Sequence, residues 1–77
     1  MANKDDDMYY YDIIRANIKK YRKEKNLTQQ KLAEMADISH DYLAEIESTK
    51  RRKTFSIAVL GRISNALNVS IKNFFEQ

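Results

Sequence analysis

The sequence predicts a small all-α protein, and three observations support that fold class. The chain has 77 residues with one glycine and no proline, so few positions would break a helix. Its apolar residues recur at three- and four-residue spacings, the period of a helix face that packs on a core. Strict polar–apolar alternation and hairpin turns of the Asn-Gly or Asp-Gly type do not occur in it, so strands are not expected.

Composition and charge narrow the possible partners. Cysteine is absent, so neither a disulfide nor a zinc–thiolate site is expected, and the chain suits a reducing cytoplasm. No apolar run approaches the length of a membrane span or a signal peptide. Residues 1–12 hold one lysine and four aspartates, a net charge of −3, so residues 13–77 carry +6 of the total of +3. A basic folded part suits a polyanion, although a basic protein without such a partner is equally compatible.

The chain is expected to divide into a tail and one domain. Residues 1–9 are predicted to be a mobile acidic N-terminal tail, and residues 10–77 the folded domain. The aspartates of the tail are either solvated or lie over the basic surface of the domain.

The first helix is expected over residues 10–25. Ile14, Ile18 and Tyr21 form a stripe that faces the core. The opposite face is expected to be solvated and to attract DNA over a distance, and it would hold Arg15, Lys19, Lys20, Lys23 and Lys25.

Residues 28–48 predict two short helices joined by a tight turn, at about 29–36 and 39–47. Each helix has an inner face, and together the two faces hold Leu32, Ala36, Leu43 and Ile46. Thr28 and Ser39 can cap these helices. Left-handed backbone is expected where helices stop, at Asp37, Asn26 and Asn68.

Two further helices are expected at about 57–67 and 71–75, capped by Ser56 and Ser70. The first has an inner stripe of Ile57, Leu60, Ile63 and Leu67. Gly61 inside that helix either admits a second subunit or is merely tolerated. Phe75 is expected to stay outside the core, either in a symmetric dimer contact or folded back on its own domain.

The spacing of apolar residues, caps and turn resembles the helix-turn-helix of the Cro/CI-type (lambda-repressor-like, or XRE) DNA-binding family. The resemblance extends from Ile14 to Phe75, and it is carried by Thr28-Gln29, Leu32-Ala33, Ile38-Ser39, Tyr42-Leu43 and Ile46-Glu47. It implies a compact five-helix lambda-repressor-like DNA-binding domain. It also implies an ion pair between Arg22 and Glu47 that ties the first helix to the third; a phosphate-contacting Arg22 is the rival interpretation.

The resemblance implies that helix 39–47 enters the major groove of DNA. Its solvent-facing residues would then read bases, and these are Ser39, His40, Asp41, Ala44 and Glu45. Phosphate contacts are expected from Thr28, Gln29, Lys31, Tyr42, Lys50, Arg51, Arg52 and Lys53. The plainer alternatives are a polar first turn at Gln29, a loop of solvated cations, and a Tyr42 that covers the domain edge.

These features predict a sequence-specific, double-stranded DNA-binding transcriptional regulator, a repressor in its simplest form. It would be cytoplasmic and nucleoid-associated, bacterial or phage-encoded, and would bind an inverted-repeat operator as a homodimer. The alternative is a protein-interaction module of the antitoxin or anti-repressor kind with weak DNA binding, which the acids Asp41 and Glu45 favour. His40 is the only histidine and no catalytic constellation occurs, so neither an enzyme nor a cofactor or metal site is expected.

Overall fold

Within the part of the chain that the structure describes, the fold is a bundle of four α-helices and one short 3-10 helix. The computed structural model describes residue 3 and residues 5–77. The elements are α1 (Tyr9–Glu24), α2 (Gln29–Ala36), α3 (His40–Glu47), α4 (Ile57–Leu67) and η1 (Ile71–Phe75). The all-helical prediction is confirmed, but five α-helices is one too many, because the last element is a five-residue 3-10 helix. None of the described helices is both long and apolar enough to cross a membrane.

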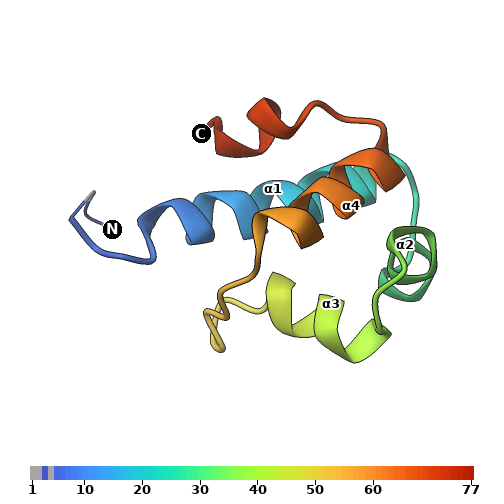
Figure 1. Cartoon of the computed structure of the whole chain (residues 1–77), viewed down its shortest axis with the longest axis horizontal. Helices are drawn as coiled ribbons and strands as arrows, with labels where there is room; N and C mark the ends of the chain where they lie inside the picture. Colours follow the sequence, from blue (N-terminus) through green and yellow to red (C-terminus); the bar gives the residue numbers. More distant parts are fainter. Residues whose placement is uncertain (1–2, 4) are drawn as a thin grey trace.

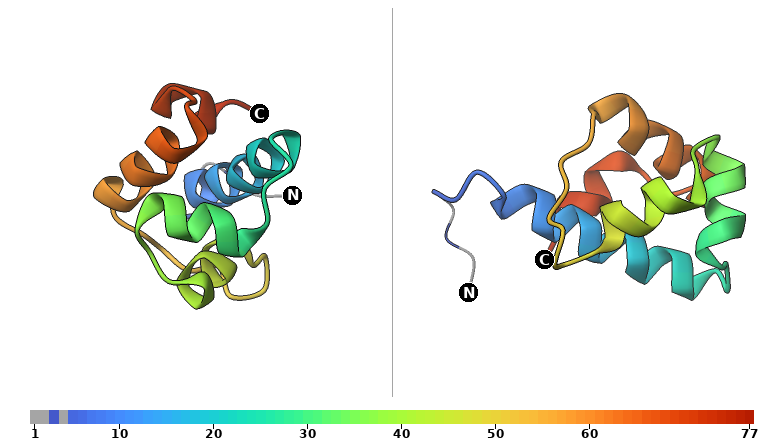
Figure 2. Two further views of the ribbon diagram at one scale, coloured as in Figure 1. Left: turned by 90° about the vertical axis from the view of Figure 1, so that its right-hand side faces the viewer. Right: turned by 90° about the horizontal axis from the view of Figure 1, so that it is seen from below.

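The long helix α1 is the centre of the arrangement (Figure 1). It packs against α3, α4 and η1, while α2 packs against both α3 and α4. Figure 2 shows η1 and α4 on one side of the molecule, and α3 with the loop that follows it on the opposite side. The helix-turn-helix of α2 and α3 is therefore held in place by α1 and α4.

Most helix ends follow the predicted signals. The side-chain oxygens of three residues accept backbone N–H groups at 3.0–3.1 Å as caps, namely Thr28, Ser39 and Ser56. Three helices end beside residues with φ of 55–58°, namely Asn26, Asp37 and Asn68. The predicted cap at Ser70 is wrong, since its side chain makes no cap hydrogen bond. The backbone carbonyl of Ser70 instead accepts the N–H of Asn73 at 2.9 Å.

The core joins the inner faces of all five elements. Its fully buried apolar residues are Ile18, Leu32, Leu43, Ile46, Leu60, Ile63, Leu67 and Phe74. The predicted inner stripe of α4 is wrong at Ile57, which is 69% exposed. Phe55 in the loop is buried instead, and its ring meets Tyr11 edge-on at 5.0 Å between centroids. The loop thus covers this part of the core before α4 begins.

Candidate nucleic-acid interface

A buried ion pair orients α3 on α1. The Arg22 guanidinium donates from Nε to Glu47 Oε2 at 2.8 Å and from Nη2 to Oε1 at 3.0 Å. It also donates to the carbonyl of Leu27 at 2.8 Å, and both members of the pair are buried. This is the bidentate geometry expected from the sequence, and it fixes the end of α3 against α1.

A second buried arginine was missed by the sequence reasoning. Arg15 is only 1% exposed, so its placement on the solvated face of α1 is wrong. It donates to the carbonyls of Ile46 at 2.7 Å and Lys53 at 2.9 Å, and to Asp12 at 3.0 Å. Its spacing from Ile18 and Arg22, three and seven residues, is the signal that puts it on their face. Arg15 therefore ties the last turn of α3 and the following loop to α1.

The residues predicted to read bases lie along the outer face of α3. Ser39, His40 and Asp41 are exposed, whereas Ala44 and Glu45 are half-buried. Asp41, Ala44 and Glu45 line one hollow of about 410 Å³, together with Ser48 and Arg51. Within the described residues no three His, Cys, Asp or Glu side chains gather in a way that could hold a metal ion.

A neighbouring hollow is lined by residues expected to contact phosphate. It measures about 460 Å³ and lies between α1, the first turn of α2, the end of α3 and the loop. Gln29 and Lys50 line it, and so does Lys19 of α1, which was not among the predicted phosphate residues. Ala44 and Ser48 line both hollows, so the two are adjacent along α3.

Several predicted phosphate residues already have a partner within the chain. The Gln29 side-chain amide donates to Glu47 at 3.0 Å, which leaves one of its two N–H groups for a phosphate. Thr28 caps α2 through its hydroxyl oxygen, and Lys31 is exposed beside it. Tyr42 is half-buried against the core with the Lys53 ammonium 5.8 Å from its ring centroid.

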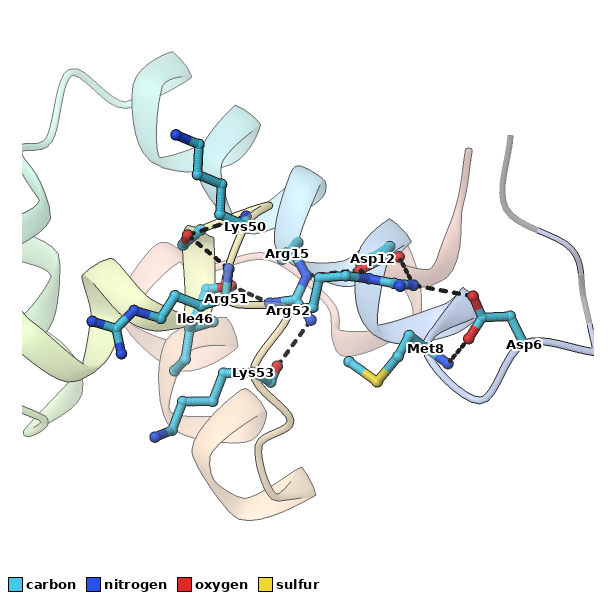
Figure 3. A network of polar contacts seen from close by, with 10 residues as sticks. Asp6, Met8, Asp12, Arg15, Ile46, Lys50, Arg51, Arg52 and Lys53 are labelled. Atoms are coloured by element: carbon cyan, nitrogen blue, oxygen red, sulfur yellow. Dashed lines mark hydrogen bonds and ion pairs between the residues drawn. The ribbon is translucent and has the colours of Figure 1, made fainter.

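In the loop after α3, the side chain of Arg52 extends in a different direction from those of Arg51 and Lys53 (Figure 3). Arg51 and Lys53 extend to one side. Each of them contacts Glu45 at 3.2 Å. Arg52, whose φ is 45°, extends the other way along α1 and contacts Asp12 at 2.7 Å and Asp6 at 3.1 Å. Arg52, one of the four loop cations expected to contact phosphate, thus has two carboxylate partners within the chain.

These contacts change the acidity of the two aspartates. A hydrogen bond from Arg52, followed by one from Arg15, lowers the pKa of Asp12 below its ordinary value. The pKa of Asp6 is lowered chiefly by a hydrogen bond from the backbone N–H of Met8 and then by Arg52. Both carboxylates therefore keep their charge to a lower pH than an ordinary aspartate does.

The residues before α1 form a hydrogen-bonded turn. The Asp6 carbonyl accepts the N–H of Tyr9 at 2.9 Å, and its carboxylate accepts that of Met8 at 2.8 Å. The tail predicted over residues 1–9 includes residues 1, 2 and 4, which lie outside the described residues. Where the chain is described, one tail aspartate does lie against a cation of the domain.

An exposed apolar groove lies at the other end of the core. Tyr10, Ile57 and Phe75 are 52%, 69% and 41% exposed, and with Tyr11 and Phe55 they line a hollow of about 220 Å³. Gly61 lies on a different hollow, and a Cβ added there would meet no atom within 4 Å apart from its chain neighbours and the backbone of its own helix. The two residues proposed for a dimer contact, Gly61 and Phe75, are thus not brought together within one chain.

Comparison with known proteins agrees with this geometry. A family model described as helix-turn-helix matches residues 18–74. The control protein C.SmaI of Serratia marcescens is 32% identical over 60 residues, which cover 78% of this chain and 69% of that protein. The immunity repressor protein of Bacillus phage phi105 is 43% identical over 54 residues. Those cover 70% of this chain but 36% of the repressor, so the chain spans about a third of that relative.

A solved structure shows the same fold. The structure of SinR, the master regulator for biofilm formation, in complex with DNA superposes with a TM-score of 0.74 and 36% sequence identity. The match covers 82% of this chain and 98% of that one.

Proposed function

We propose that this chain, which belongs to the Cro/CI-type helix-turn-helix family of DNA-binding transcriptional regulators, represses transcription by binding an inverted-repeat operator as a homodimer. Residues 10–77 would form the DNA-binding domain. The outer face of α3 would enter the major groove, and the first turn of α2 and the loop would contact the phosphates.

The observation that carries this proposal is the pair of adjacent hollows along α3. One is lined by Asp41, Ala44 and Glu45, whose carboxylates and methyl group suit cytosine N4 and the thymine methyl group. The other is lined by Gln29, Lys50 and Lys19, whose donors suit phosphate oxygens. A base-reading surface beside a phosphate-binding surface is the arrangement that sequence-specific DNA binding requires.

The apolar groove supports the homodimer. Three large exposed side chains around one hollow are costly in a monomer and suit a symmetric contact in which each copy covers the other. Two copies of α3 would then read half-sites centred about 10 bp apart. Phe75→Ser with Ile57→Ser should make the protein monomeric at concentrations where the natural chain is dimeric, as measured by sedimentation.

The test of DNA recognition is selection from a random double-stranded library at two salt concentrations. The natural chain should enrich an inverted repeat. His40→Ala with Glu45→Ala should change the enriched sequence while the protein stays folded, because neither side chain belongs to the buried core. As the matched control, Glu34→Gln on the exposed face of α2 should leave the sequence unchanged.

One observation favours a second function, binding of another protein. Asp41 is an exposed acid on the face proposed to meet a polyanion, and it would repel phosphates. If no sequence is enriched and retention of DNA collapses with salt, an antitoxin-like or anti-repressor partner becomes the better proposal.

A further inference from the structure

The acid nearest the end of the reading face is held by two cations of the loop. Glu45 Oε2 accepts Arg51 Nη1 at 3.2 Å, and Glu45 Oε1 lies 3.2 Å from Lys53 Nζ. Lys53 also lies against the Tyr42 ring. The Glu45 side chain is 30% exposed, while that of Arg51 is 66% exposed. The carboxylate is thus neutralised locally, and the cation most accessible to a phosphate is one of those that neutralise it.

When DNA binds, two anions would compete for Arg51 and Lys53, namely the Glu45 carboxylate and a DNA phosphate. A phosphate that draws them away leaves Glu45 without a partner in the groove, where an unpaired carboxylate is unfavourable. A cytosine N4–H₂ group facing Glu45 would replace the lost partners. Opposite any other base, the cations can stay with Glu45, at the cost of their phosphate contacts.

We propose that Arg51 and Lys53 act as positioning residues for Glu45. Because they can pair with its carboxylate, they lower the energetic cost of a wrong base opposite Glu45. They thereby weaken discrimination at the base pair that α3 reads through Glu45. The inference rests on the proposed function. Ordinarily, phosphate contacts carry no sequence information. Here the phosphate contacts and the base contact are linked, because the same two cations serve both.

The test compares variants that remove loop cations with and without a contact to Glu45. Arg51→Gln with Lys53→Gln removes both partners of Glu45, whereas Lys50→Gln removes a cation of the same loop that makes no side-chain contact with Glu45 among those of the described residues. Affinity is measured on the selected operator and on three versions with the base pair facing Glu45 replaced. That pair is identified as the one whose preference is lost in Glu45→Gln.

The double variant should bind every sequence more weakly. Its preference for the selected base pair over the three replacements should nevertheless rise by at least about fivefold, because opposite a wrong base the Glu45 carboxylate then has no cation to pair with. Lys50→Gln should weaken binding with the preference unchanged. In a Glu45→Gln background, the double variant should leave the preference at that pair unchanged. Circular dichroism melting verifies that all variants fold.

An unchanged or reduced preference in the double variant would overturn the inference, as would an equal rise in Lys50→Gln, which would point to net charge alone. Either result leaves the proposed function standing if the natural chain still enriches a repeat. If the natural chain enriches no sequence, the proposed function fails and the inference fails with it.

Discussion

The two arginines of α1 and the two arginines of the loop use the same side chain for opposite purposes. Arg15 and Arg22 are 1% and 8% exposed, and they donate to carbonyls or to a buried carboxylate. Arg51 and Arg52 have side chains 66% and 42% exposed, and their carboxylate partners are partly exposed as well. Both pairs join α1, α3 and the loop, but at very different depths.

The burial of an ion pair determines whether a contact with another molecule can replace it. A buried charge that loses its partner costs about 3–5 kcal/mol, whereas an exposed ion pair contributes about 0–1 kcal/mol and is screened by salt. Arg15 and Arg22 therefore hold the end of α3 firmly against α1. The contacts of Arg51 and Arg52 are weak enough to be replaced by contacts with DNA.

The largest expected effect is at the buried pair. Glu47→Gln should lower the free energy of unfolding by about 3–5 kcal/mol, because it leaves the buried Arg22 uncompensated. For a domain of this size that is a large fraction of the stability, about 4–12 kcal/mol by the usual per-residue range. Urea unfolding followed by circular dichroism measures it.

The matched control is Glu34→Gln, an exposed acid of α2, which should change stability by less than about 0.5 kcal/mol. Replacing both members, Arg22→Met with Glu47→Met, should recover much of the loss, since neither charge is then buried. Equal stability of Glu47→Gln and Glu34→Gln would contradict the distinction by depth.

Arg15→Met should have the next largest effect. It leaves the carbonyls of Ile46 and Lys53 without this donor, at a cost of about 1–3 kcal/mol for a buried acceptor. DNA affinity should also fall under conditions where the variant remains folded, because the loop loses its tie to α1. Lys19→Met, an exposed cation of the same helix, is the stability control and should unfold like the natural chain.

A smaller effect is expected where Asp6 meets Arg52. Asp6→Asn should raise affinity for all DNA sequences by about two- to fivefold at low salt, because Arg52 loses an acid that competes with phosphate. Asp7→Asn removes the same charge one residue away and should raise affinity less. If the two variants behave alike in a filter-binding titration, the tail acts only through its net charge.

The smallest effect is on stability in acid. Arg52 and Arg15 lower the pKa of Asp12 in the folded state, so its contribution is present above the unfolded pKa of about 3.9 and is lost as the pH falls through the lower folded value. Asp12→Asn should therefore flatten the loss of stability below about pH 4, by at most about 1 kcal/mol. Thermal melting between pH 5 and pH 2 measures it, and an equally steep loss in the variant would contradict the assignment.

Local features of this fold could be predicted because their causes lie within a few residues. The caps at Thr28, Ser39 and Ser56 and the left-handed turn at Asp37 each depend on one side chain and its own backbone. The bounds of α2 and α4 were correct for the same reason. The bidentate contact between Arg22 and Glu47 was expected only because the spacing resembled a known family.

What the sequence determined, then, is the order of helices, the positions of their ends and the outward face of α3, since helical periodicity and capping act over three or four residues. Only the tertiary structure decided that Arg15 is buried and Ile57 exposed, because each depends on which segment covers it. It also decided the partners of Glu45 and Arg52, which lie 6 to 46 residues away along the chain. Charge patterns do not specify such pairings, because any exposed cation can serve any nearby acid until the fold brings one within reach.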